Sequence, residues 1–170
     1  MFLKTLQHIL HEFEVDTHYA SATEESPLAQ LFIEIPIADQ EPSLLELCII
    51  PVPNDEIDLL QCFVQIPMLP PFEAADDVPE FLVAEVQTYL ATLNQMLPLV
   101  GFSCVSQRIY YRCLTPVQDL EHSRANVLYT IQSIAQLVQI CQVSVQNVAL
   151  GQQSAAAAIE KIPEIFGLEE

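Results

Sequence analysis

The fold of this chain is decided by the stretch LFIEIPI at residues 31–37, whose pattern returns in LLELCIIPV at 44–52 and in LLQCFVQIPM at 59–68. Each stretch is an apolar-rich run that ends in Ile-Pro and one further apolar residue. Because proline donates no hydrogen bond to a sheet ladder, a proline at the same place in each run marks a strand end or a bulge. The linkers 39–43 and 53–56 are too short for a parallel crossover. The three runs therefore predict an antiparallel three-stranded meander.

The segment before the meander predicts one helix and one ambiguous stretch. Residues 2–13 carry apolar side chains at helical spacing, which indicates an amphipathic helix. Its apolar face holds Phe2, Leu6, Ile9 and Phe13. Residues 15–22 alternate only loosely, so this stretch is either a short edge strand or a loop.

A second helix is predicted to begin after the meander. Asp77 fits an N-cap whose capping box is completed by Glu80, and Pro79 suits the first turn because its missing N–H is not needed there. Pro98 ends the helix. The apolar stripe of this helix holds Leu82, Val86, Tyr89, Leu93 and Met96.

The runs 99–106 and 108–115 are joined so tightly that they predict a β-hairpin. Side-chain alternation puts Ile109, Tyr111 and Cys113 on one side of the second run. The other side holds Arg108, Tyr110 and Arg112. Two of the chain's 5 cations thus share one side, which could bind an anion or an acidic substrate. In so acidic a protein, however, a solvated or internally paired side is the more common outcome.

The last third of the chain is unusual because residues 125–159 contain no charged side chain. One apolar seam in this segment alternates between four- and three-residue spacing, which predicts a long helix of about six or seven turns. The seam consists of Val127, Ile131, Ile134, Val138, Cys141, Val145 and Val148. Glutamines on nearly every turn exclude a membrane span. Gly151 ends the helix, and Ser154 caps a short helix in the tail 151–170.

Two explanations of this seam remain open. Core packing is the more common role of such a stripe, and contact with a second chain is the alternative. The absence of charge favours the contact, because charged residues are depleted in the cores of interfaces. The predicted contact residues are Leu128, Ile131, Ile134, Leu137, Val138 and Cys141.

Charge and hydropathy restrict the partners of the protein. The 170 residues include 23 Asp and Glu against 5 Lys and Arg, a formal net charge of -18. That field repels nucleic acid and anionic membranes, so neither is expected as a partner. It either favours encounter with basic polypeptides or serves solubility alone. The mean hydropathy of +0.32 is high, so part of the apolar surface is expected to face a partner.

No motif in the sequence indicates catalysis, cofactor binding or metal binding. A Gly-x-Ser-x-Gly elbow is absent, and 3 glycines leave no phosphate-binding loop. His8, His11 and His18, with Glu12 nearby, are better explained as solvated side chains than as metal ligands. We therefore expect that the protein is not an enzyme and that it binds neither a cofactor nor a metal.

The cysteines and the first residues predict a cytoplasmic protein. The 5 cysteines lie in apolar runs without a Cys-x-x-Cys pair, which indicates buried, reduced thiols. The first residues lack the continuous apolar core of a signal peptide, because Gln7, His8 and His11 interrupt it. The length suits one α+β domain over 1–170.

The element order resembles that of the YbjN-like family and, through it, the type III secretion chaperone-like α+β fold. This order is helix, three-stranded meander, helix, two-stranded hairpin and long helix, with helices covering the sheet, and the resemblance spans residues 2 to 149 of this small acidic chain. It implies a homodimer that binds segments of other polypeptides or acts in regulation without catalysis. It supplies no catalytic residues to transfer.

Two hypotheses of different classes follow. The first is a dimeric, non-catalytic protein-binding module, chaperone-like or regulatory, that uses the last long helix or a sheet edge. The second is a small-ligand or anion-binding protein, at most a weak enzyme, that uses Arg108, Tyr110 and Arg112 together with the histidines of the first helix. The spacing of these residues does not show that they converge.

Overall fold

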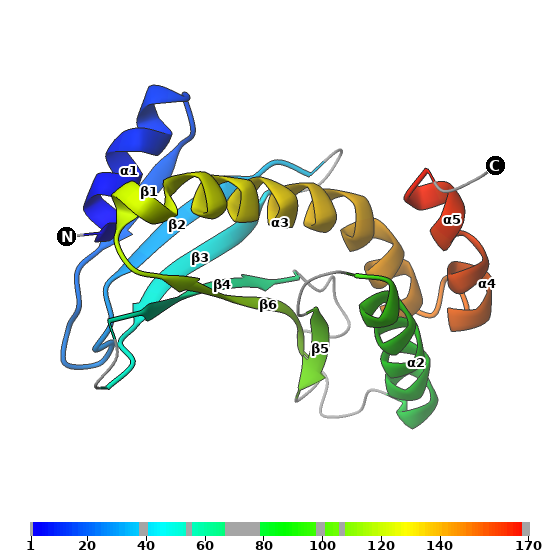
Figure 1. Cartoon of the computed structure of the whole chain (residues 1–170). Helices are drawn as coiled ribbons and strands as arrows, with labels where there is room; N and C mark the ends of the chain where they lie inside the picture. Colours follow the sequence, from blue (N-terminus) through cyan, green and yellow to red (C-terminus); the bar gives the residue numbers. More distant parts are fainter. Residues whose placement is uncertain are drawn as a thin grey trace. The chain divides into compact units, whose positions relative to one another are not determined.

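The computed structural model describes residues 2–37, 41–53, 56–66, 79–97, 101–105 and 108–167, and confirms the predicted α+β class (Figure 1). The elements in chain order are α1 (Phe2–Glu12), β1 (Thr17–Ala20), β2 (Gln30–Ile35), β3 (Ser43–Ile50), β4 (Asp58–Gln65), α2 (Glu80–Met96), β5 (Phe102–Val105), β6 (Arg108–Val117), α3 (Leu120–Ala149), α4 (Ala155–Glu160) and α5 (Ile162–Ile165). The strands form one six-stranded antiparallel sheet in the order β1-β2-β3-β4-β6-β5.

The predicted meander is present as β2, β3 and β4. Leu31 pairs with Leu47 between β2 and β3, and Leu47 pairs with Cys62 between β3 and β4. Pro36 and Pro51 directly follow the last residues of β2 and β3, which confirms the prediction that these prolines mark strand ends. The third proline, Pro67, and parts of the two linkers lie outside the described residues.

The ambiguous stretch 15–22 contains a strand. Its residues Thr17–Ala20 form β1, which pairs antiparallel with β2 and is the edge of the sheet. The edge strand has only four residues, and short edges of this kind offer little ladder to another chain. The weak alternation in the sequence reflects this position, because no residue of β1 is fully buried.

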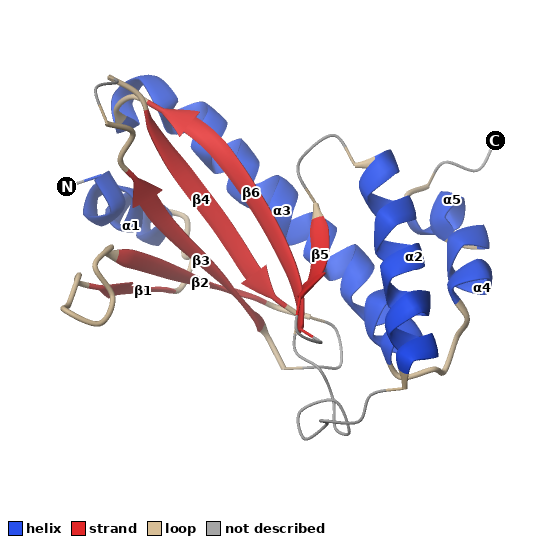
Figure 2. Cartoon of the chain, turned by 90° about the horizontal axis from the view of Figure 1, so that it is seen from below, coloured by secondary structure: helices blue, strands red, loops and turns tan. Residues whose placement is uncertain are grey.

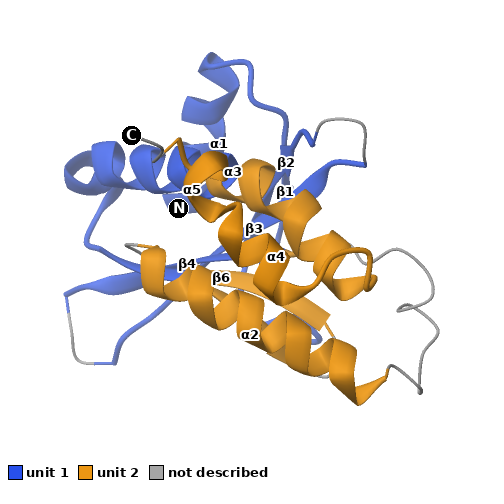
Figure 3. Cartoon of the chain, turned by 90° about the vertical axis from the view of Figure 1, so that its right-hand side faces the viewer, with its two compact units in different colours: residues 1–64, 113–136 blue, residues 65–112, 137–170 orange. Residues whose placement is uncertain are grey.

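The chain divides into two compact units (Figure 3). Unit 1 comprises residues 1–64 and 113–136, and unit 2 comprises residues 65–112 and 137–170. Each unit combines two separate stretches of sequence, and both β6 and α3 contribute residues to each unit. Neither unit is therefore a contiguous sequence domain, and the division follows packing rather than a linker.

Unit 1 is a sheet with helices on one side. α1 contacts β1, β2 and β3, and residues 120–136 of α3 lie on the same side as α1 (Figure 1). Full burial of a Leu or Ile side chain contributes about 1.5–3 kcal/mol, so each such side chain in this layer stabilises unit 1. The buried side chains of this layer include Leu6, Ile9, Leu31, Ile33, Leu45, Leu47 and Leu60.

The predicted apolar face of α1 is wrong at its last member. Leu6 and Ile9 are buried as expected, whereas Phe13 is 60% exposed. The helix ends at Glu12, so Phe13 no longer follows the helical spacing that would turn it towards the sheet. Leu3 and Leu10, beside the predicted stripe, complete the buried face instead.

Unit 2 is built around α2, which contacts both β5 and α4. Val86, Tyr89 and Leu93 of the predicted stripe are buried, but Met96 is exposed in the last turn. Pro79 is the N-cap residue rather than part of the first turn, and the proposed caps Asp77 and Pro98 lie outside the described residues. The remaining member, Leu82, is half-buried.

Two polar contacts fix α2 within unit 2. The Tyr89 hydroxyl donates a hydrogen bond of 2.7 Å to Ser144 Oγ on α3, and burial raises the pKa of that phenol. Glu85 Oε2 accepts a hydrogen bond of 2.5 Å from the backbone N–H of Ala155 at the start of α4. Ser154 also caps α4, as predicted, by accepting from the Ala157 N–H.

The free edge of β5 is closed by a side chain of α2. Asn94 Nδ2 donates to the Phe102 carbonyl at 2.6 Å, and Asn94 Oδ1 accepts from the Phe102 N–H at 2.7 Å. The amide thus pairs with the strand as a neighbouring backbone would. A Cβ at Gly101 would overlap the Asn94 side chain, so glycine is required beside this contact. The predicted hairpin is confirmed, with Val105 paired to Arg108, and its turn residues 106–107 lie outside the described residues.

We expect Asn94→Ala to lower the free energy of unfolding by about 2 kcal/mol, because it removes two hydrogen bonds of about 1 kcal/mol each. Urea denaturation followed by circular dichroism measures the change. The control is Asn126→Ala at an exposed position of α3, which should change stability by no more than about 0.5 kcal/mol. Equal effects of the two substitutions would contradict the role assigned to Asn94.

The long helix is confirmed but begins earlier than the uncharged segment. α3 starts at Leu120, so its first turns include Glu121 and Arg124. Asp119 Oδ1 caps it by accepting a hydrogen bond of 2.8 Å from the His122 N–H. Gly151, at a positive φ of 68°, follows the helix end as predicted. Every member of the predicted seam from Val127 to Val148 is buried.

Candidate functional site

The side of the sheet away from α1 and α3 carries several partly exposed apolar side chains of unit 1. Figure 2 shows β3, β4 and β6 in front of α3, and no described helix of unit 1 lies over this side. We call it the open face. Leu44 is 48% exposed and Leu114 is 40% exposed. The open face consists of Phe32, Leu44, Ile50, Leu59, Phe63 and Leu114.

A carboxylate lies in the middle of the open face. Phe32 of β2 pairs with Glu46 of β3, and Glu46 pairs with Phe63 of β4, so one row alternates ring, carboxylate and ring. Gln30 Nε2 donates a hydrogen bond of 2.6 Å to Glu46 Oε1, and the His18 ring stacks on Phe32 at 6.3 Å between centroids. The open face is thus apolar with an embedded negative charge.

An acidic pocket adjoins the open face through Glu34. Glu34 is the next outward-facing residue after Phe32 on β2, and it pairs with Leu44 of β3. The pocket has a volume of about 510 Å³. Its lining is Glu14, Val15, Asp16, Glu34, Pro36, Ile37 and Pro42, which combines three exposed carboxylates with an apolar remainder. These residues include no Lys or Arg.

Glu14 enters the acidic pocket from a strained backbone position. Its φ is 58°, the left-handed conformation that glycine normally occupies after a helix. The Val15 N–H donates to the Leu10 carbonyl and the Glu14 N–H donates to the His11 carbonyl, both at 3.1 Å. These two bonds form a Schellman motif at the end of α1, with glutamate at the position that favours glycine.

We expect Glu14→Gly to raise the free energy of unfolding by about 0.5–1 kcal/mol. The left-handed conformation costs a non-glycine residue about 1–2 kcal/mol, which exceeds the entropic cost of glycine of about 0.5–1 kcal/mol. Chemical denaturation measures the difference. The control is Glu12→Gly in the last turn of α1, where glycine should instead destabilise by about 1 kcal/mol. A loss of stability in Glu14→Gly would show that the strain is absent.

The six predicted contact residues of α3 are mostly core residues. The side chains of Ile131, Ile134, Val138 and Cys141 are buried within the chain itself, so they present little or no surface to a second chain. Leu128 and Leu137 are half-buried. The absence of charge, which favoured an interface for this seam, reflects the interior of the protein at these four positions.

The exposed side of α3 is also free of charge beyond Arg124. Tyr129 is 71% exposed, and Ile140 and Val143 are exposed as well. We call the exposed residues of this side the outer side of α3. They are Ala125, Asn126, Tyr129, Gln132, Gln136, Gln139, Ile140 and Val143. The sequence pattern favours the seam rather than this side for the contact, because spacing alone does not reveal which of two apolar stripes faces the core.

The predicted anion-binding side of β6 exists but does not form a convergent site. Arg108 and Arg112 are exposed on one side of the strand, with half-buried Tyr110 between them. Four residues of strand separate their Cα atoms by about 13 Å. Ser103 and Val105 of β5 pair with Tyr110 and Arg108, respectively, so no further cation joins the group from that strand.

The histidines do not assemble into a metal site. His8 Nε2 lies 3.8 Å from Glu12 Oε1, and His11 Nε2 lies 2.8 Å from Thr17 Oγ1. The two imidazoles are therefore engaged by different local partners. In the part of the chain that the structure describes, no group of three His, Cys, Asp or Glu residues is placed to hold a metal ion.

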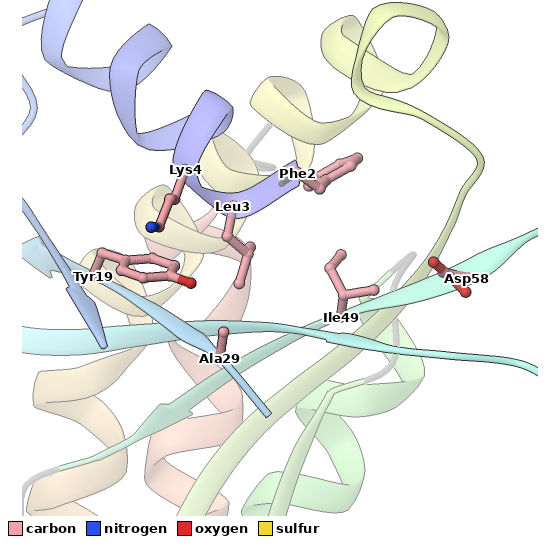
Figure 4. Close-up of a pocket in the computed structure, with 7 residues that line it drawn as sticks. All are labelled: Phe2, Leu3, Lys4, Tyr19, Ala29, Ile49 and Asp58. Atoms are coloured by element: carbon pink, nitrogen blue, oxygen red, sulfur yellow. The ribbon is translucent and has the colours of Figure 1, made fainter. Parts of the chain in front are cut away.

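A second pocket of unit 1 lies between the first turn of α1 and the sheet (Figure 4). It has a volume of about 350 Å³ and is lined by Phe2, Leu3, Lys4, Tyr19, Ala29, Ile49 and Asp58. The Lys4 Nζ sits 5.1 Å from the centroid of the Tyr19 ring, within the range of a cation–π interaction. The Lys4 charge is directed at this ring, and Asp58 lies at the opposite end of the pocket. The polar groups therefore do not converge on one ligand.

Two buried thiols, those of Cys62 and Cys141, are poor nucleophiles. Cys48, Cys62, Cys113 and Cys141 are buried as predicted, and Cys104 is half-buried. Burial raises the pKa of the Cys141 thiol to about 12, and burial together with the nearby Cys113 and Cys48 raises the pKa of Cys62. Because the thiolate is the reactive form, such thiols stay protonated and inert at neutral pH.

The clearest exposed titrating pair is Asp119 and His122 at the start of α3. The His122 N–H and ring hold the pKa of Asp119 below its usual value, and the Asp119 carboxylate raises the pKa of His122. The stabilising contribution of a lowered Asp pKa is lost as pH falls through that folded-state value. The contribution of a raised His pKa is lost as pH rises through it. The contact therefore stabilises the folded state most at pH values between the lowered pKa of Asp119 and the raised pKa of His122.

We expect Asp119→Asn to lower the pKa of His122 towards that of a free imidazole. Asparagine is itself a good N-cap, so α3 should stay capped. An NMR titration of the His122 ring protons measures the shift. The control is Glu164→Gln, which removes a carboxylate from α5 in the other unit and should leave the titration of His122 unchanged. An unchanged pKa in Asp119→Asn would show that this carboxylate does not act on the ring.

The described helices include none that is long and apolar enough to cross a membrane. A scan against protein-family models and searches of curated proteins and of solved structures found no significant match for this chain. The resemblance to the YbjN-like family and the type III secretion chaperone-like fold therefore stays a prediction, and the candidate site rests on the geometry of unit 1 and α3.

Proposed function

We propose that this chain is a non-catalytic protein-binding module, chaperone-like or regulatory, that acts in the cytoplasm as a small acidic homodimer and binds segments of other polypeptides. The observation that carries the proposal is the outer side of α3, which is exposed, uncharged after Arg124 and holds Tyr129, Ile140 and Val143. An exposed helix side normally carries charged residues, whereas the centre of an interface is depleted of them.

Charge supports the assignment of a second copy to this side. Each chain has a formal net charge of -18, so two copies repel one another over most of their surfaces. The outer side of α3 is a surface on which they could meet without bringing carboxylates together. The 30 residues of α3 extend over about 45 Å, which is long enough for two such helices to pack side by side.

We expect light scattering over a dilution series to give twice the chain mass of 19.0 kDa for the wild type. Tyr129→Asp and Val143→Asp should each weaken the dimer by at least about tenfold, since they place charge at its centre. Phe81→Asp is the matched control, because Phe81 is an exposed apolar residue on α2 and should leave the dimer intact. Circular dichroism checks that each variant is folded.

A wild type that is monomeric at every concentration would contradict the dimer, and so would a folded Tyr129→Asp variant with unchanged mass. Val138 is unsuitable for this test. Its side chain is fully buried, so Val138→Asp would place a carboxylate in the core and unfold the protein instead of probing a contact.

A further inference from the structure

We propose that the open face and the acidic pocket of unit 1 together form a docking site for a basic, apolar segment of a partner polypeptide. Apolar side chains of the segment would cover Phe32, Leu44 and Phe63, and a Lys or Arg side chain would enter the acidic pocket. This inference rests on the proposed function, because it names the segment that the protein-binding module takes.

The apolar half of the site comes from strand alternation. Most inward side chains of β2, β3 and β4 are buried, whereas Phe32, Leu44, Ile50, Leu59 and Phe63 point to the other side and stay partly exposed. An exposed apolar surface rimmed by polar residues is the usual mark of a protein contact. The described helices of unit 1 lie on the inward side, so none of them covers the outward side of these strands.

The charge of the site selects a basic segment. Glu46 lies within the open face, Glu34 lies at its border, and Glu14 and Asp16 complete the acidic pocket. Lys4 lies over Tyr19 on the inward side of the sheet, and Arg124 lies on α3. Arg112 is exposed on the outward side of β6, two residues from Leu114, and β3 and β4 separate that strand from β2 in the sheet. A Lys or Arg bound in the acidic pocket would thus meet carboxylates in a lining that contains no cation.

The same charges disfavour a second copy of this chain at this site. A two-fold contact through the open face would bring Glu34 and Glu46 of each copy near the carboxylates of the other, in two chains of charge -18. Like charges opposed in an interface weaken the contact. Charge complementarity therefore assigns the outer side of α3 to the second copy and the open face to a basic partner.

The geometry also sets the spacing within the segment. Phe32 and Glu34 lie two residues apart on β2, a distance of about 7 Å along the strand. A suitable segment carries a cation two residues from an apolar side chain if it is extended, or one turn away if it is helical. The required sequence feature is thus a Lys or Arg close to a bulky apolar residue.

The test measures binding of three labelled peptides to the full chain by fluorescence anisotropy. The first alternates leucine with lysine, the second has glutamate in place of lysine, and the third has glutamine. We expect the basic peptide to bind tightest and to weaken as salt is raised, because exposed ion pairs are screened. Leu44→Ser should weaken its binding at least about threefold, whereas Phe81→Ser on α2 should not.

A pair of triple variants separates the site from the net charge of the chain. Glu14→Gln, Asp16→Asn and Glu34→Gln together remove the carboxylates of the acidic pocket. Glu24→Gln, Glu25→Gln and Glu121→Gln remove the same charge from other exposed positions of unit 1. We expect the pocket variant to bind the basic peptide about tenfold more weakly and the control variant to bind it within about threefold of wild type.

Each outcome decides the inference separately from the proposed function. Equal losses in the two triple variants would overturn the site, because the peptide would then respond only to net charge. Tighter binding of the neutral or acidic peptide would overturn the basic segment while leaving a protein-binding module. Absence of binding by any peptide to a folded dimer would overturn the inference and leave dimerisation. A monomer that retains pocket-dependent binding would support the inference alone.

Discussion

The alternation of side chains along the paired strands of unit 1 is the constraint on which the rest of this unit depends. Antiparallel pairing of β2, β3 and β4 places Leu31, Leu47 and Cys62 on one side, where α1 and the first half of α3 complete a core. A shift of one residue in either pairing would move the inward side chains of a strand to the opposite side. The register therefore determines at once which residues form the core and which form the open face.

The excess of acidic residues acts on this arrangement by restricting what can approach it. A net charge of -18 keeps a chain of high mean hydropathy from associating through most of its surface. The two exceptions differ in kind. The outer side of α3 lacks charge, whereas the open face combines apolar side chains with carboxylates. We infer that the outer side of α3 suits a second copy of this chain and that the open face suits a basic partner.

Several elements are held by local polar contacts that apolar spacing does not reveal. Asn94 closes the edge of β5, Asp119 caps α3, which begins five residues before the uncharged segment, and Glu14 turns the chain after α1. Each contact uses a backbone group that would otherwise be unpaired at the end of a helix or strand. Capping by Asp119 could have been read from the sequence, since aspartate is a favoured N-cap. The partner of Asn94 could not, because it lies on another element.

The α+β class, the meander, the hairpin and the long helix could be predicted from residue order, because these follow from periodicity, from short linkers and from proline at strand ends. The two apolar stripes of α3 and the acidity of the chain are also visible there. The burial of the stripe with Ile134 and Val138 and the exposure of Tyr129 became visible in the folded chain. It alone joined Glu14, Asp16 and Glu34 in one pocket. The physical reason is that periodicity defines the sides of an element, whereas the choice between core and surface depends on which other elements pack against each side.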